Sequence, residues 1–231
     1  MKKESFVKML KTAQNNGIIV SNISFENMFS SQMSEVAYSQ AISRLCREGI
    51  LYRISKGVYA FPKQTKFGSV LPSSSELIDI YCGNTNGMIV GYTMYNERHL
   101  TTQISKCINI YSNKVRENVK VIGELKIVRV DLEFSSNIKN IIEVLEVLEN
   151  YNKIQDLNMD AFNSFIQNKI YSYNEEDFRM VIKNINYHKR TLAFYRMVLN
   201  HFGIQNTVST CLSSMSKYDI PNLEEIYKTK R

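Results

Sequence analysis

The segment of residues 34–62 constrains the fold most, because a helical pattern runs there directly into two short β-rich runs. A helix advances about 100° per residue, so side chains can be assigned to its faces by their spacing. One face is apolar and consists of Tyr38, Ala41, Ile42 and Leu45. The opposite face consists mainly of short polar side chains and arginines: Val36, Ser39, Gln40, Ser43, Arg44 and Arg47. The spacing therefore predicts a helix with one buried and one polar side.

Two β-rich runs, residues 50–54 and 58–61, follow this helix. Gly49 is suited to end the helix, and Ser55-Lys56-Gly57 separates the runs, which predicts a hairpin with Lys56 at its tip. A polar helix followed by a basic hairpin is typical of a winged helix-turn-helix. The expected fold class is therefore α+β, with this module at its amino-terminal end.

The residues before residue 34 supply the supporting elements that a winged helix-turn-helix needs. Residues 3–15 carry Phe6, Met9, Leu10 and Ala13 at helical spacing, which predicts a first helix. Ser24 is expected to cap a short second helix that ends near Phe29. Residues 18–20 are β-branched and are expected to add a small strand beside the hairpin.

The polar side of the helix predicts a surface that binds double-stranded DNA. Gln can pair with adenine in the major groove, Ser can bond several bases, and Arg can contact guanine or phosphate. The expected DNA-binding residues are Ser34, Ser39, Gln40, Ser43, Arg44 and Arg47 on the helix, with Arg53, Lys56 and Lys63 around the hairpin. The alternative is a solvated amphipathic helix with an ordinary hairpin, as in a protein-binding module.

The distribution of charge favours the DNA-binding interpretation. Residues 1–70 contain ten Lys and Arg against four Asp and Glu, a net charge of +6. Residues 71–130 have a net charge of +2 and residues 131–231 a net charge of −1. Because phosphate contacts are made mainly by Lys and Arg, the amino-terminal segment is the expected DNA-binding part.

The composition predicts a globular protein of one or two domains in the cytoplasm. Its 231 residues are 44% hydrophobic, enough for a core. The sequence contains neither a signal-peptide pattern nor the roughly 20 apolar residues of a membrane span. The four cysteines are far apart and are expected to be buried, reduced thiols, with no metal site and no cofactor: Cys46, Cys82, Cys107 and Cys211.

The remaining chain predicts a second, larger domain. Residues 62–72 are expected to be a linker between a DNA-binding domain at residues 1–66 and a domain at residues 72–231. Residues 72–132 alternate helical and strand patterns and predict a small α/β part. Residues 136–203 contain four amphipathic stripes and predict a helical bundle, with Glu143 and Glu146 outside its apolar stripe. Residues 204–231 are expected to be a tail.

Three stretches resemble the AbiEi family of abortive-infection antitoxins: KGVYAFPKQTKFG at residues 56–68, GYTMYNERHLTTQ at 91–103 and INIYSNK at 108–114. The resemblance is strongest between residues 40 and 130. It implies a non-enzymatic antitoxin of a type IV toxin–antitoxin system in phage defence. It also implies that residues 72–231 form the antitoxin domain. Such a protein would bind repeated half-sites in its own promoter, repress its operon and counteract an AbiEii-like nucleotidyltransferase toxin.

The sequence leaves other functions open. A polar site is expected from Tyr92, Tyr95, Asn96, Thr101, Thr102 and Gln103, although these side chains could equally serve packing. Glu124-Leu125-Lys126 resembles part of a nuclease site but lacks the upstream acid that a metal would require, so no catalytic residue is expected. The alternatives to an antitoxin are a winged-helix regulator whose second domain senses a ligand or dimerises, and a protein-interaction scaffold.

Overall fold

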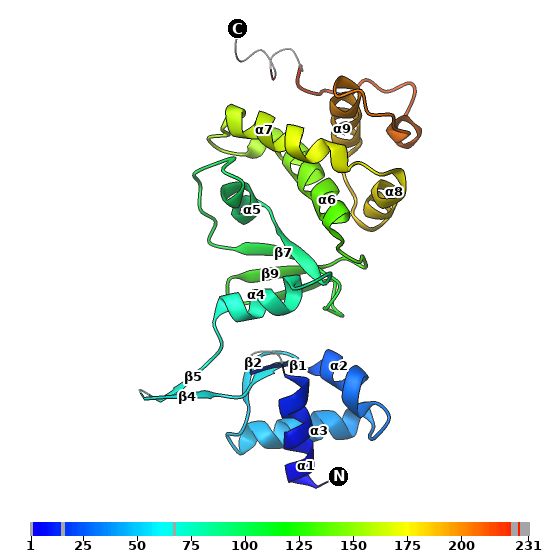
Figure 1. The fold of residues 1–231 in the computed structure, drawn as a ribbon. Helices are drawn as coiled ribbons and strands as arrows, with labels where there is room; N and C mark the ends of the chain where they lie inside the picture. The colour runs from blue at the N-terminus through cyan, green and yellow to red at the C-terminus, as the bar shows by residue number, and fades with distance from the viewer. Residues whose placement is uncertain (1, 15–16, 67, 223–225, 227–231) are drawn as a thin grey trace. The chain divides into compact units, whose positions relative to one another are not determined.

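The computed structural model describes residues 2–14, 17–66, 68–222 and Ile226 (Figure 1). The chain divides into two compact units, Met1–Ile80 and Tyr81–Arg231. Both helices and strands are present, which confirms the mixed α/β class. The assignment of residues 1–66 and 72–231 to separate functional domains stays a prediction.

The first unit has the order of elements of a winged helix-turn-helix. Its elements are α1 (Lys3–Ala13), β1 (Ile18–Val20), α2 (Ser21–Ser24) with a π-helical turn (Phe25–Phe29), α3 (Glu35–Arg47), β2 (Tyr52–Ser55) and β3 (Val58–Ala60). The strands form an antiparallel sheet in the order β1-β3-β2. The hairpin and the additional strand β1 are therefore confirmed.

Three aromatic side chains hold the helices of the first unit together. The Phe6 ring of α1 lies 5.0 Å from that of Phe29 and 5.8 Å from that of Tyr38 on α3. All three residues are buried, together with Leu10, Ile42 and Leu45. Since Tyr38, Ile42 and Leu45 are one face of α3, this core determines which face of the helix remains exposed.

The start of α2 differs from the prediction. The helix begins at Ser21 and not after Ser24, which is buried within it. The reason is that β1 runs into α2 without a loop. The Ser21 N–H donates a hydrogen bond to the Gly57 carbonyl at 2.8 Å, so the hairpin takes the place of a side-chain cap.

The expected linker at residues 62–72 is also wrong, because most of it is a second hairpin. β4 (Lys63–Thr65) pairs antiparallel with β5 (Gly68–Val70). Gly68 has a φ of 114°, a value that favours glycine. The Thr65 hydroxyl donates a hydrogen bond to the Gly68 carbonyl at 2.7 Å, which closes the turn.

The helix α4 (Ser74–Cys82) follows this hairpin and includes the division between the two units. Its start is a capping box. The Ser73 N–H donates to Glu76 Oε2 at 2.9 Å, and the Glu76 N–H donates to Ser73 Oγ at 3.4 Å. The helix therefore begins directly after its capping residue, Ser73.

A four-stranded sheet begins the second unit. Its elements are β6 (Gly87–Val90), α5 (Tyr92–Glu97), β7 (Ile108–Ser112), β8 (Val119–Ile122) and β9 (Leu125–Arg129). The strand order is β6-β7-β9-β8, in which β7 and β9 are parallel and the other pairs are antiparallel. These elements confirm the small α/β part predicted from residues 72–132.

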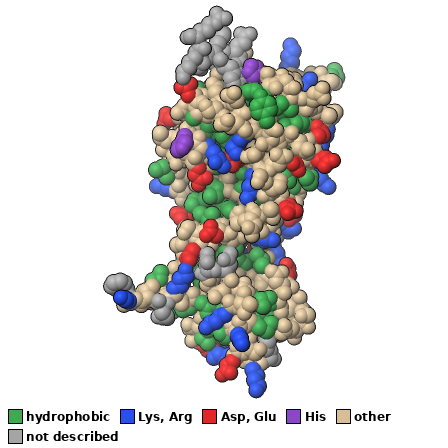
Figure 2. Space-filling model, viewed as in Figure 1, with side chains coloured by type: hydrophobic (Ala, Val, Ile, Leu, Met, Phe, Trp, Pro, Cys, Tyr) green, Lys and Arg blue, Asp and Glu red, His purple; other side chains and the backbone are tan. Residues whose placement is uncertain are grey.

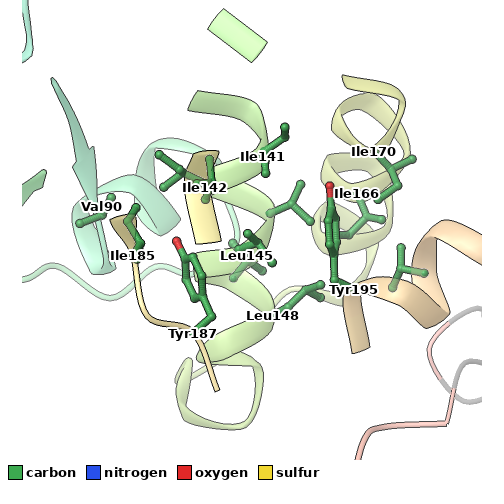
Figure 3. Packing of buried hydrophobic residues seen from close by; sticks show 14 of the residues in the cluster. Val90, Ile141, Ile142, Leu145, Leu148, Ile166, Ile170, Ile185, Tyr187 and Tyr195 are labelled. Carbon is green, nitrogen blue, oxygen red and sulfur yellow. The ribbon is translucent and has the colours of Figure 1, made fainter. Parts of the chain in front are cut away.

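Four helices complete the second unit: α6 (Ser136–Glu149), α7 (Met159–Lys169), α8 (Glu175–Asn184) and α9 (Lys189–His201). Three short 3₁₀ helices lie between or after them, at Tyr151–Lys153, Ile170–Ser172 and Val208–Cys211. α6 contacts α7, α8, α9 and β6. The predicted helices are confirmed, and β6 and α5 share one hydrophobic core with them (Figure 3).

The surroundings of α6 explain why two of its carboxylates are buried. Glu143 is 5% exposed and Glu146 is 7% exposed, so the expectation that both lie outside the apolar face is wrong. Val144 and Val147 are buried as well, so the helix is apolar around most of its circumference. A helix that is apolar on most sides lies inside a protein, so the polar residues that it carries are buried as well.

Candidate nucleic-acid interface

The serine before α3 begins the candidate interface. The Ser34 hydroxyl accepts a hydrogen bond from the Ala37 N–H at 3.2 Å, which caps the helix. The buried face of α3 turns its opposite face to solvent. The predicted residues on that face are all exposed: Ser39, Gln40, Ser43, Arg44 and Arg47. Together with Glu35 and Val36 they line one shallow depression on the surface of the helix.

The chemistry of this face fits the edges of base pairs. Gln40 and Ser43 offer hydrogen-bond donors and acceptors, and Val36, which is 67% exposed, offers an apolar surface that suits a thymine methyl group. No carboxylate in the described ranges forms an ion pair with Arg44 or Arg47. Figure 2 shows Lys and Arg side chains on the visible face of the first unit.

The hairpin carries the second part of the predicted interface. Arg53 on β2 and Lys56 in the turn between β2 and β3 are both exposed. Gly57 has a φ of 74°, which only glycine adopts readily in this turn. The Gly57 carbonyl also accepts the Ser21 N–H, so the tip of the hairpin is joined to the start of α2.

Lys63 has different surroundings from the other predicted residues. It lies on β4, outside the β2–β3 hairpin, and its ammonium group forms an ion pair with Glu76. The hydrogen bond from Lys63 lowers the pKa of the Glu76 carboxyl below its usual value. The charge of Lys63 is therefore compensated within the chain, unlike those of Arg44 and Arg47.

The first unit therefore presents an exposed polar helix, α3, directly before the antiparallel β2–β3 hairpin. Residues 33–62, which include α3 and the β2–β3 hairpin, match the family model described as "Transcriptional regulator, AbiEi antitoxin". The resemblance to AbiEi antitoxins is thereby confirmed for that segment.

Comparison with solved structures finds a protein titled "Crystal structure of RV2827C protein from Mycobacterium tuberculosis". The sequences are 9% identical and the TM-score is 0.38. The match covers 87% of this chain and 76% of the other. No curated protein matches the sequence.

The second predicted polar site consists mainly of side chains that hold loops in place. Asn96 Nδ2 donates to the Thr101 and Gln103 carbonyls at 3.2 and 3.4 Å. The Thr101 hydroxyl donates to the Gln155 carbonyl at 2.6 Å, and Gln103 Nε2 donates to Asp156 at 2.7 Å. These bonds join the loop after α5 to the loop after α6. Thr102 is exposed.

Tyr92 and Tyr95 face a different environment from the other four predicted residues. Both line a cavity of about 380 Å³ in the second unit. The other polar residues that line it are Asn109, Tyr111, Lys126, Glu146, Asn150 and Lys153. The sequence did not predict these six residues as part of a site because they come from four separate segments. The one signal in the sequence was Glu146, a glutamate in a helix that is apolar on nearly every side.

Glu146 contributes a buried carboxylate to this cavity. Its Oε1 accepts hydrogen bonds from the Tyr111 hydroxyl at 2.9 Å and the Tyr187 hydroxyl at 3.2 Å. Burial raises the pKa of Glu146, although these two hydrogen bonds oppose the shift. Burial and the neighbouring Glu146 charge also raise the pKa of Tyr111.

Within the described residues, no group of three or more His, Cys, Asp and Glu side chains is arranged to hold a metal ion. Cys107 is exposed, and the other three cysteines are half-buried, so the expectation of buried thiols is wrong. None of the helices that the structure describes is long and apolar enough to cross a membrane.

Proposed function

We propose that this protein is a DNA-binding transcriptional regulator whose helix α3 enters the major groove while the β2–β3 hairpin contacts the phosphate backbone. The observation that carries the proposal is the exposed face of α3, where Gln40, Ser43 and Arg47 stand opposite the buried Tyr38, Ile42 and Leu45. Gln40 and Ser43 would read bases, and Arg44 and Arg47 would contact guanine or phosphate. Lys56 would contact phosphate.

We further propose that the protein is a cytoplasmic, non-enzymatic antitoxin that represses its own operon. The support is the family description matched by residues 33–62 and the AbiEi-like stretches at residues 91–103 and 108–114. Residues 1–66 would bind repeated half-sites in the promoter, and residues 72–231 would counteract a nucleotidyltransferase toxin encoded beside it. A regulator with a ligand-binding second unit is the alternative, favoured by the cavity beside Tyr92 and Tyr95.

Binding to the protein's own promoter tests the DNA-binding part. Arg44→Ala and Arg47→Ala should each weaken binding by about 1–3 kcal/mol if the arginine contacts a base. The matched control is Lys8→Ala, which removes one exposed positive charge from α1. Affinity is measured by gel shift at fixed salt. Equal affinities of the wild type and both arginine variants would overturn the assignment of this face.

Co-expression with the adjacent gene product tests the antitoxin part. The wild-type protein should restore growth of cells that produce the toxin. The double variant Arg44→Ala/Arg47→Ala should still restore growth while a promoter reporter loses repression, because the changes lie in the first unit. Growth arrest in the presence of soluble wild-type protein would contradict the antitoxin function. The proposal that the protein binds its promoter would still stand.

A further inference from the structure

The cavity of the second unit has an unused hydrogen-bond acceptor at its floor. Both tyrosine hydroxyls that reach Glu146 donate to the same oxygen, Oε1. Within the described part of the chain, no hydrogen bond uses Oε2. This oxygen is therefore available to accept a hydrogen bond from a donor group of a ligand in the cavity.

The rim of the same cavity is positively charged. Lys126 on β9 and Lys153 in the 3₁₀ turn after α6 both line it, and both are exposed. Neither ammonium group forms an ion pair with a carboxylate of the described residues. The Tyr92 hydroxyl donates a hydrogen bond to the Lys153 carbonyl at 2.9 Å, which holds this part of the rim in place.

The walls between rim and floor combine aromatic and amide groups. Tyr95 and Tyr111 contribute apolar ring surface. Asn109 also lines the cavity, and its side-chain amide makes no hydrogen bond within the ranges that the structure describes. The volume of about 380 Å³ lies near the lower end of known small-molecule sites, which span about 300–1,000 Å³, so a ligand must be compact.

We propose that this cavity binds a compact organic molecule with an anionic group at one end and N–H donors at the other. The anionic group lies between Lys126 and Lys153, and an N–H donor bonds to Glu146 Oε2. A nucleoside monophosphate and a basic amino acid share this chemistry. The site consists of residues of the second unit, whereas α3 belongs to the first. The proposal extends the alternative of a ligand-binding second unit, and neither the DNA-binding nor the antitoxin function requires it.

Calorimetric titration of the full chain tests the site with three probes: GMP, L-arginine and inorganic phosphate. GMP or arginine should bind, and phosphate, which has no N–H donor, should bind at least about tenfold more weakly. Binding of GMP alone identifies a nucleotide site, and binding of arginine alone identifies an amino-acid site. The absence of binding by both at millimolar concentration overturns the proposal.

Variants at the rim test where the anion lies. Lys126→Ala and Lys153→Ala should each lower the affinity for the bound probe about tenfold, because each removes a charge-assisted contact. The control Lys183→Ala removes an exposed charge on α8, outside the cavity, and should leave affinity unchanged. Equal losses in all three variants would reveal a general charge effect and overturn the assigned rim.

Glu146→Gln tests the floor with little change in shape. The glutamine oxygen can still accept from Tyr111 and Tyr187, while its amide nitrogen, a donor, replaces Oε2. Affinity should fall at least about tenfold with the midpoint of thermal unfolding nearly unchanged. Unchanged affinity in this variant would overturn the role of Oε2. If the variant does not fold, the Lys126→Ala titration still decides whether the site exists.

Discussion

Arg98 donates two hydrogen bonds to Glu143, from Nε to Oε2 at 3.0 Å and from Nη2 to Oε1 at 2.7 Å. Lys169 on α7 also pairs with Glu143 Oε2, at 2.9 Å. One buried carboxylate on α6 thus joins the end of α5 to α7. The free-energy cost of burying the Glu143 carboxylate is offset because two cationic side chains, Arg98 and Lys169, pair with it.

Arg98→Ala should lower the free energy of unfolding by about 2 kcal/mol, because it leaves Glu143 buried with one partner. Urea unfolding followed by circular dichroism measures the change. The control is Arg129→Ala, whose partner Asp131 is 61% exposed. Exposed pairs contribute at most about 1 kcal/mol, so the control should change little. Equal losses in both variants would contradict the importance of burial.

Lys56→Ala should reduce the salt dependence of promoter binding. If Lys56 contacts one phosphate, the slope of log affinity against log salt should become less steep by about one, with no change in sequence preference. Fluorescence anisotropy over a range of salt concentrations gives the slope, and Lys8→Ala serves as the control. A changed preference among operator sequences would show that Lys56 reads a base.

Gly87→Ala should destabilise the second unit by about 3 kcal/mol or more, because the added Cβ forces the backbone apart. That Cβ would lie 2.2 Å from the Tyr111 carbonyl oxygen and 2.3 Å from that of Tyr81. Gly123→Ala is the control. Its φ of 56° costs about 1 kcal/mol for alanine, but nothing lies within 4 Å of the new atom. Thermal unfolding should show a larger loss of stability for Gly87→Ala than for Gly123→Ala. A larger loss for Gly123→Ala would refute the close approach of the two carbonyl groups to Gly87.

Glu175 should make stability depend on pH below 4.5. Burial acts to raise the pKa of its carboxyl, but hydrogen bonds from Thr207, Tyr173 and Arg179 outweigh burial and lower the pKa to about 2. Its stabilising contribution is therefore complete above its usual value of 4.5 and is lost as the pH falls towards 2.

Glu175→Gln should consequently flatten the decline of unfolding free energy between pH 4.5 and pH 3, measured by urea titration at each pH. The matched control is Glu176→Gln, which changes the next carboxylate in the same first turn of α8. A decline as steep in Glu175→Gln as in the wild type would show that these hydrogen bonds do not persist in solution.

The sequence predicted most elements because their signals are local. The spacing of Tyr38, Ile42 and Leu45 identifies the buried face of α3, and Ser34 marks its start. Likewise, Asn174 caps α8 by accepting hydrogen bonds from the Glu176 and Asp177 N–H groups at 2.9 and 3.1 Å. Patterns of this kind depend on neighbours within one or two turns.

What the sequence could not predict depends on contacts between distant segments. Glu146 is buried because Tyr111 and Tyr187, 35 and 41 residues away, donate to it. Similarly, the start of α2 depends on Gly57, a residue of the hairpin. The cavity follows from such contacts, so only two of the six predicted polar residues belong to it, Tyr92 and Tyr95.

The position of α6 limits how this protein can be dissected. Because its apolar residues pack against both β6 and the helices α7, α8 and α9, a truncation between β9 and α6 would expose a hydrophobic surface on each fragment. Such fragments would aggregate, and a failure to rescue growth would then report misfolding instead of the location of antitoxic activity. Deletion mapping should therefore keep the sheet and the helices on one fragment.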